Sequence, residues 1–194
     1  MKRAILVVTP LLLLAGLIAC SEGDPMGSAS GNVSVFLTDA PINLDEVSAV
    51  NVTIEEMVLF PVCEDPDTDC AGIPLDLVPP EGVDGVTLNL LDYRDGHVIL
   101  MASAQVPEGD YSKIRMVIAT ATLLEDTDQD PTTPESEEAI FLPSGKVDVV
   151  MPFSVTAGED TEVILDFDAA LSVHVNETGN HKYILRPVIN ASMR

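Results

Sequence analysis

Four carboxylates in one acidic segment have the spacing of a calcium-binding loop. Asp126, Asp128 and Asp130 alternate along the chain, and Glu137 follows, so that counted from Asp126 they occupy positions 1, 3, 5 and 12. An EF-hand loop uses these positions because Ca²⁺ takes roughly six to eight oxygen ligands. Pro131 stands where that loop needs glycine, and no flanking helix is expected. A calcium site and a solvated acidic loop therefore both remain open interpretations.

Cys20 has the surroundings of a lipid-attachment site. Lys2 and Arg3 precede an apolar run that ends in Leu17-Ile18-Ala19-Cys20. This pattern resembles the bacterial lipobox, in which the cysteine is acylated and the peptide is cut just before it. Two or three acyl chains suffice for stable membrane anchoring. We therefore expect a membrane-anchored protein, and Ser21 after the cysteine favours the outer over the inner membrane.

The other two cysteines form an even pair. Cys63 and Cys70 enclose a polar acidic segment, and in an exported protein such a pair is expected to form a disulfide. Two free surface thiols are the alternative. Zinc binding is disfavoured because the chain has no second cysteine pair and no histidine nearby.

No catalytic constellation is recognisable among the remaining polar residues. His97, His174 and His181 have no nucleophile motif or metal-type spacing beside them, although His174 and His181 could bind a soft metal across a hairpin. Asp166 and Asp168 would share one face of a strand, which alone does not indicate acid–base chemistry. We therefore expect a protein that is not an enzyme.

Charge and composition exclude several classes of partner. The full chain of 194 residues has a net charge of −23, and loss of Lys2 and Arg3 with the signal leaves 7 basic against 32 acidic residues, a net charge of −25. Nucleic acid is excluded because its phosphates would be repelled. The chain has no Trp, three Tyr and five Phe, which disfavours sugar stacking. Tyr93 is the aromatic residue that we would substitute first to test glycan binding.

Alternating apolar residues predict strands along most of the chain. Val33, Val35 and Leu37 set the pattern, which Val50 to Leu59 repeats. Gly- and Pro-containing turns separate the runs, and no helix longer than two turns is expected. The further expected strands are 86–91, 97–101, 113–124, 138–142, 146–153, 162–167, 171–175 and 182–191. This pattern predicts an all-β, antiparallel two-sheet sandwich, Ig-like or transthyretin-like, with a small β-barrel as the alternative.

Several segments resemble one family of exported lipoproteins. They are residues 33–41 (VSVFLTDAP), 50–54 (VNVTI), 89–92 (NLLD), 107–115 (PEGDYSKIR), 166–173 (DFDAALSV) and 183–189 (YILRPVI). In this order they resemble the DUF4382 family of bacterial and archaeal lipoproteins. The resemblance implies a β-sandwich domain on the cell envelope and carries no activity, substrate or site residue.

The chain is expected to contain one folded domain. Residues 1–19 form the signal peptide, 20–31 a flexible tether rich in Gly and Ser, and 32–194 the β domain. The expected function is a lipid-anchored envelope module that binds, adheres or assists. Calcium in its acidic loop stays one of two open interpretations, and an envelope protein or a glycan is the candidate partner. An envelope-associated hydrolase or a carbohydrate-binding protein is the alternative.

Overall fold

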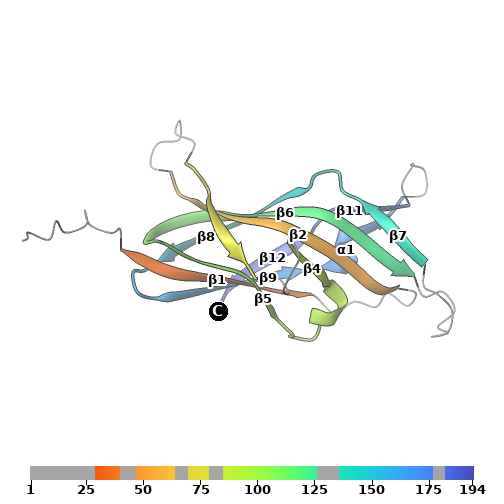
Figure 1. Ribbon diagram of the computed structural model, residues 1–194, viewed down its shortest axis with the longest axis horizontal. Helices are drawn as coiled ribbons and strands as arrows, with labels where there is room; N and C mark the ends of the chain where they lie inside the picture. Colours follow the sequence, from red (N-terminus) through yellow and green to blue (C-terminus); the bar gives the residue numbers. More distant parts are fainter. Residues whose placement is uncertain (1–28, 40–46, 64–69, 79–84, 126–135, 177–181) are drawn as a thin grey trace, which may run out of the picture.

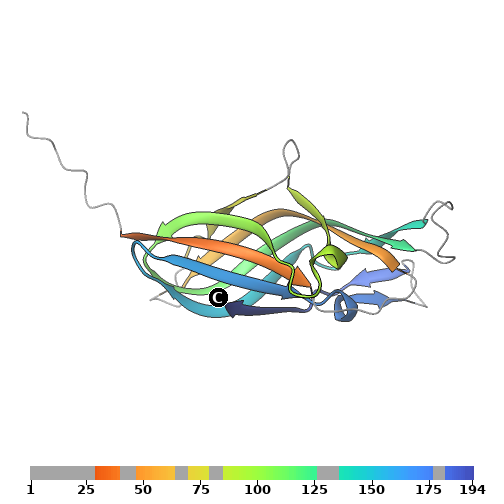
Figure 2. The ribbon, with the colours of Figure 1, turned by 90° about the horizontal axis from the view of Figure 1, so that it is seen from below.

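The computed structural model describes residues 29–39, 47–63, 70–78, 85–125, 136–176 and 182–194. These residues form an all-β fold that curls into an open half-barrel (Figures 1 and 2). In chain order the elements are β1 (Ser30–Asp39), β2 (Val47–Pro61), β3 (Ile73–Leu77), β4 (Val86–Asn89), the 3-10 turn η1 (Leu90–Tyr93), β5 (Ile99–Pro107), β6 (Gly109–Glu125), β7 (Ser136–Phe141), β8 (Lys146–Val155), β9 (Asp160–Phe167), the short helix α1 (Ala169–Ser172), β10 (Val173–Val175), β11 (Tyr183–Leu185) and β12 (Ile189–Met193).

The strands connect through hydrogen-bonded ladders into one continuous order. That order is β10-β11-β7-β6-β2-β3-β5-β1-β9-β12, with β4 also on β2 and β8 also on β6. Most pairs are antiparallel, but β1 and β9 run parallel, as do β11 and β7. The expectation of an all-β fold is confirmed. The division into two separate sheets is not confirmed, because the ladders join the strands into one curled sheet.

The core lies inside the curl and follows the alternation of the sequence. Val33, Val35 and Leu37 on β1 are fully buried, and Val163 and Leu165 on the neighbouring β9 are fully buried as well. Facing them, the inner positions of β2 and β6 are mostly aliphatic as well. Each buried aliphatic side chain contributes about 1.5–3 kcal/mol by leaving water, so this buried face stabilises the curled sheet.

The structure corrects three expected strands. Residues 171–175 do not start as a strand, because Asp168 accepts a hydrogen bond from the Leu171 N–H at 2.9 Å and caps the helical turn α1. Residues 86–91 give β4 and then η1, which Asn89 caps in the same way. Residues 182–191 divide into β11 and β12 around Pro187, which has no N–H to continue a ladder. The strand β3 has no counterpart among the expected strands.

The first described residues lie at one end of the molecule. Glu108 N–H donates to the Ala29 carbonyl at 2.7 Å, and Gly158 N–H donates to the Ser30 carbonyl at 2.8 Å, so the start of β1 is tied to two turns. At the opposite end β6 finishes at Glu125 and β7 begins at Ser136 (Figure 1). The described part of the chain contains no helix long and apolar enough to cross a membrane.

Candidate functional site

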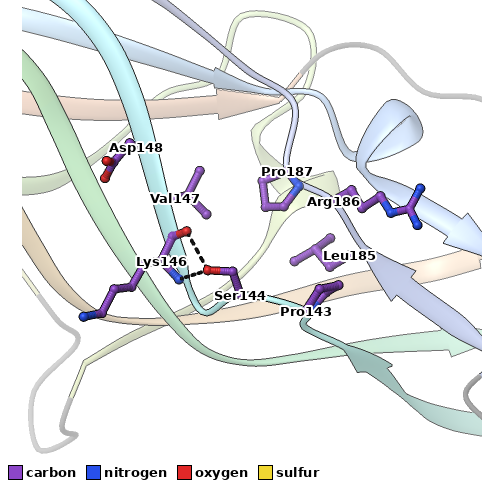
Figure 3. A pocket seen from close by; sticks show the side chains of 8 residues that line it. All are labelled: Pro143, Ser144, Lys146, Val147, Asp148, Leu185, Arg186 and Pro187. Carbon is purple, nitrogen blue, oxygen red and sulfur yellow. Dashed lines mark hydrogen bonds between the residues drawn. The ribbon is translucent and has the colours of Figure 1, made fainter.

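A pocket lies beside the first half of β8, between that strand and the segment that joins β11 to β12 (Figure 3). Its volume is about 410 Å³. The lining is apolar in the middle and polar at its margins: Pro143, Ser144, Lys146, Val147, Asp148, Leu185, Arg186 and Pro187. Such a lining of apolar surface with a few polar groups is typical of binding sites.

Ser144 folds back onto the backbone at the start of β8. Its hydroxyl accepts a hydrogen bond from the Lys146 N–H at 3.2 Å and donates to the Lys146 carbonyl at 3.1 Å (Figure 3). This one side chain therefore satisfies both backbone groups that a neighbouring strand would otherwise satisfy. The edge of β8 is closed at Lys146 by a side chain and not by a strand.

Two cations stand at the margins of the pocket. Lys146 and Arg186 are exposed, and neither side chain has a hydrogen-bond or ion-pair partner among the described residues. In Figure 3 their side chains extend away from the pocket on opposite sides. They cannot clamp one small anion between them, but an extended segment that lies along β8 at the pocket would have one cation on each side.

Asp148, the acidic residue of the lining, is already neutralised. Arg115 contacts it through Nε at 2.6 Å and through a second nitrogen at 2.9 Å, and Lys113 Nζ lies 2.7 Å from it. These hydrogen bonds, that of Arg115 first, hold the pKa of Asp148 well below its usual range. Both cations also lie over the Phe60 ring, at 4.7 Å for Lys113 and 5.0 Å for Arg115. The surface around the pocket is therefore positive.

A second cluster, the acidic corner, lies where the parallel strands β1 and β9 end. It consists of Asp39, Asp166 and Asp168. Asp39 is 3% exposed, and one of its oxygens accepts a hydrogen bond from the Ala169 N–H at 2.9 Å. Its other oxygen and one oxygen of Asp166 are buried without a hydrogen-bond partner among the described residues.

The surroundings raise two pKa values in this corner. Burial, reinforced by the charges of Asp168 and Asp166, raises the pKa of Asp39 to about 6, although the Ala169 N–H and Arg94 oppose the shift. Burial and the Asp168 charge also raise the pKa of Asp166. The corner can therefore bind a proton near neutral pH, but its most perturbed carboxylate is closed to solvent.

Segments that carry the family resemblance meet at this corner. Thr38 Oγ1 lies 2.9 Å from the Tyr93 carbonyl and 2.8 Å from the His97 carbonyl. Ser172 Oγ donates to the Asp168 carbonyl and accepts from the Val188 N–H at 2.8 Å. Residues far apart in the chain thus tie β1, η1, α1 and the start of β12 together. In these bonds the two side chains satisfy backbone groups, which indicates a structural role for this junction.

The predicted site residues have different outcomes. Cys63 and Cys70 lie at disulfide distance, with Cα atoms 5.9 Å apart, as the sequence predicts. Cys20, Asp126, Asp128 and Asp130 lie outside the described residues. Lipidation of Cys20 and calcium binding therefore stay predictions.

Glu137, the remaining predicted calcium ligand, is an exposed residue of β7 opposite Leu124 of β6. Within the described ranges, no group of three His, Cys, Asp or Glu side chains is placed to hold a metal ion. Tyr93 ends η1 and is half-buried against the core, so only part of its ring faces solvent. His174 is exposed on β10, and His181 lies outside the described residues.

Sequence reasoning missed the pocket beside β8. Lys146 and Arg186 are 40 positions apart, and no motif links them. The one signal that could have found them is scarcity: the chain has only 9 Lys and Arg residues, so each cation of the folded domain merits attention.

Comparison with known proteins identifies a family and nothing beyond it. The model of the family DUF4382, described as a domain of unknown function, matches residues 30–187. No curated protein matches the chain, and no solved structure does. The matched range contains both the pocket beside β8 and the acidic corner, and it ends just before β12.

Proposed function

Because the chain belongs to the DUF4382 family, for which no function is described, we propose a function from its own residues: a lipid-anchored envelope protein that binds a partner and carries out no catalysis. Cys20 is the attachment point, at the outer membrane. The observation that carries the proposal is the place where the chain enters the folded domain. The fold starts at Ser30, beside the turn after β8, so an N-terminal anchor attaches at that end of the molecule.

This geometry would hold the pocket away from the membrane. β8 runs from Lys146 at the pocket to Val155 near the anchored end. Nine residue steps at about 3.3 Å each separate the two by about 30 Å. In this proposal the curled sheet, with its two halves packed as a sandwich around one core, acts as a rigid spacer. The pocket is then presented to molecules in the space beyond the lipid.

The accessibility of the acidic side chains to a substrate supports binding over catalysis. Asp39, whose pKa of about 6 suits a general acid or base, is 3% exposed and cannot reach a substrate. The pocket beside β8 is open, but its one carboxylate, Asp148, is held in ion pairs. The acid and the pocket that a hydrolase would combine therefore lie at different places.

Labelling in cells tests the anchor. The full chain is expressed in a bacterium fed an alkyne analogue of palmitate, alongside Cys20→Ala and Cys63→Ala/Cys70→Ala. We expect the wild type and the double variant to take up label and to fractionate with the outer membrane, because only the Cys20 thiol is acylated. The Cys20→Ala protein should carry no label. Label that persists in Cys20→Ala, or wild-type protein found free of membrane, would overturn the proposal.

A further inference from the structure

Two edges of the curled sheet face each other without pairing. Ile118 N–H donates to the Gly145 carbonyl at 2.7 Å, so Val147 and Val149 are the next β8 residues that bond β6. The N–H and C=O groups of Lys146, Asp148 and Val150 consequently point to the other edge. No described residue forms a ladder with β8 on that side, because β6, which lies on the opposite side, is the one described strand that pairs with β8.

The opposite edge belongs to β12. Arg194 N–H donates to the Glu162 carbonyl and Asp168 N–H donates to the Val188 carbonyl. Alternation then directs the backbone groups of Ile189, Ala191 and Met193 away from β9. β8 and β12 thus approach each other without a ladder, with some of their Cα atoms within 8 Å, and the pocket of about 410 Å³ lies between the first half of β8 and the segment that precedes β12.

The free edge of β8 is protected against strand addition at its two ends but not between them. Natural edges are blunted by inward charges, prolines or covering loops. Ser144 covers the backbone of Lys146, and Pro152 has no N–H to offer. Between them, Asp148 and Val150 leave backbone donors and acceptors without partners among the described residues. The Val150 side chain is 75% exposed, which is high for an apolar residue of a strand.

The charge around this edge is opposite to that of the molecule. Four of the 9 Lys and Arg residues surround it, namely Lys113, Arg115, Lys146 and Arg186, whereas the whole chain carries −23. The first two neutralise Asp148, and the last two have no acidic partner among the described residues. A segment that binds this edge is therefore expected to carry carboxylates.

We infer that the free edge of β8 at Asp148 and Val150 accepts an extended acidic segment of a partner protein as an added strand. The backbone of the segment pairs with β8, and its carboxylates meet Lys146 and Arg186 on the two sides of the pocket. Added strands gain affinity from main-chain hydrogen bonds and specificity from alternate side chains. This inference rests on the proposed binding function and names the chemistry of the partner.

A second copy of the chain fits this edge less well than an acidic peptide does. In the register that centres two β8 strands on Asp148, a two-fold axis would place Lys146 against the apolar Val150 and Asp148 against its own counterpart. They would also bring two highly negative surfaces together. An acidic segment without cations of its own avoids both conflicts.

Fluorescence anisotropy with purified full chain tests the inference. The probe is a labelled peptide, Glu-Val-Glu-Val-Glu-Val-Glu, at about 20 mM NaCl. We expect binding that weakens about tenfold in Lys146→Glu and in Arg186→Glu, because each reversal places a like charge beside the probe. Arg194→Glu, a matched reversal at the far end of β12, should bind as the wild type does.

A second pair of variants separates strand addition from simple charge attraction. Val150→Pro removes the edge N–H without touching the bonds to β6 and should abolish binding, whereas Val150→Ala removes only the side chain and should retain it. Circular dichroism confirms that each variant is folded. No binding of the probe by wild type, equal loss in Arg194→Glu, or unchanged binding by Val150→Pro would overturn the inference.

Two further readouts assign the remaining outcomes. If inorganic polyphosphate bound as tightly as the peptide, the surface would recognise charge alone and would not accept a strand. If the wild type formed a dimer that dissociated in Val150→Pro, the edge would belong to a second copy of the chain. Either result contradicts the inference. If the peptide does not bind while Cys20 still takes up label, only the acidic partner is ruled out. If the peptide binds while Cys20 takes up no label, only the anchor is ruled out.

Discussion

Asp39 is the residue whose burial has the largest electrostatic consequence. One of its oxygens accepts from the Ala169 N–H, and the other has no partner among the described residues. Its pKa rises from 3.8 to about 6, so the folded protein holds this proton more tightly than the unfolded chain. The stability that this group contributes is complete below about pH 3.8 and is lost as the pH rises through about 6.

We expect Asp39→Asn to stabilise the protein at pH 7.5. The amide keeps an oxygen for the Ala169 N–H and removes the buried charge. Because one pKa unit corresponds to about 1.4 kcal/mol, the gain in unfolding free energy is about 1–3 kcal/mol at pH 7.5 and close to zero at pH 4. Urea unfolding at both values measures it, with the exposed Asp160→Asn as control. A loss of stability at pH 7.5 would show that the charge is compensated.

At the scale of elements, sequence periodicity anticipated most strands but not their interruptions. Burial alternates strictly over Val33 to Leu37, and over Val50 to Leu59 it alternates except at Glu55 and Glu56, where both side chains are exposed. Both segments form long strands with the expected faces buried. At η1 and α1 one polar side chain outweighs the apolar pattern, and at Pro187 a missing N–H ends the strand. Asp168 satisfies the N–H of Leu171 and bends the chain into α1, although the sequence there still alternates.

The pocket beside β8 could not be predicted for a different reason. Its two walls come from β8 and from the segment around Pro187, which become neighbours only when the sheet curls. Local patterns specify which face of a strand is buried, but the order of the strands depends on long-range pairing. The Cys63–Cys70 pair needed only local spacing, so sequence reasoning could reach it.

Ser172 joins α1 to the segment that leads into β12, and its removal tests that junction. The side chain is fully buried, donates to the Asp168 carbonyl and accepts from the Val188 N–H at 2.8 Å. We expect Ser172→Ala to lower the unfolding free energy by about 1–3 kcal/mol, because a partly buried N–H is left without its acceptor. Ser154→Ala, on the exposed face of β8, is the control.

Hydrogen exchange localises this effect. The Val188 amide should exchange faster in Ser172→Ala, whereas amides in the middle of β6 should change only as far as global stability does. Equal stability of Ser172→Ala and Ser154→Ala would show that another group takes over the bond to Val188.

At the scale of the whole molecule, the large net negative charge opposes folding. The chain carries −23, and the described residues form four ion pairs: Lys113 and Arg115 with Asp148, Lys182 with Glu125, and Arg194 with Glu162. Exposed pairs are worth about 0–1 kcal/mol each, and salt weakens them. Salt also weakens repulsion among the many unpaired carboxylates, which the compact state brings closer together. The two effects act in opposite directions.

Repulsion should prevail, because unpaired carboxylates far outnumber the pairs. Raising NaCl from about 0.01 to 0.15 M shortens the screening length from about 30 to 8 Å, which removes most long-range repulsion but leaves contacts of about 3 Å largely intact. We therefore expect the melting temperature to rise by about 2–8 °C over this range. Thermal unfolding followed by circular dichroism measures the rise, and the same osmolality of sucrose controls for solvent exclusion. A melting temperature that falls with salt would mean that the ion pairs around Asp148 and Glu125 outweigh the net charge.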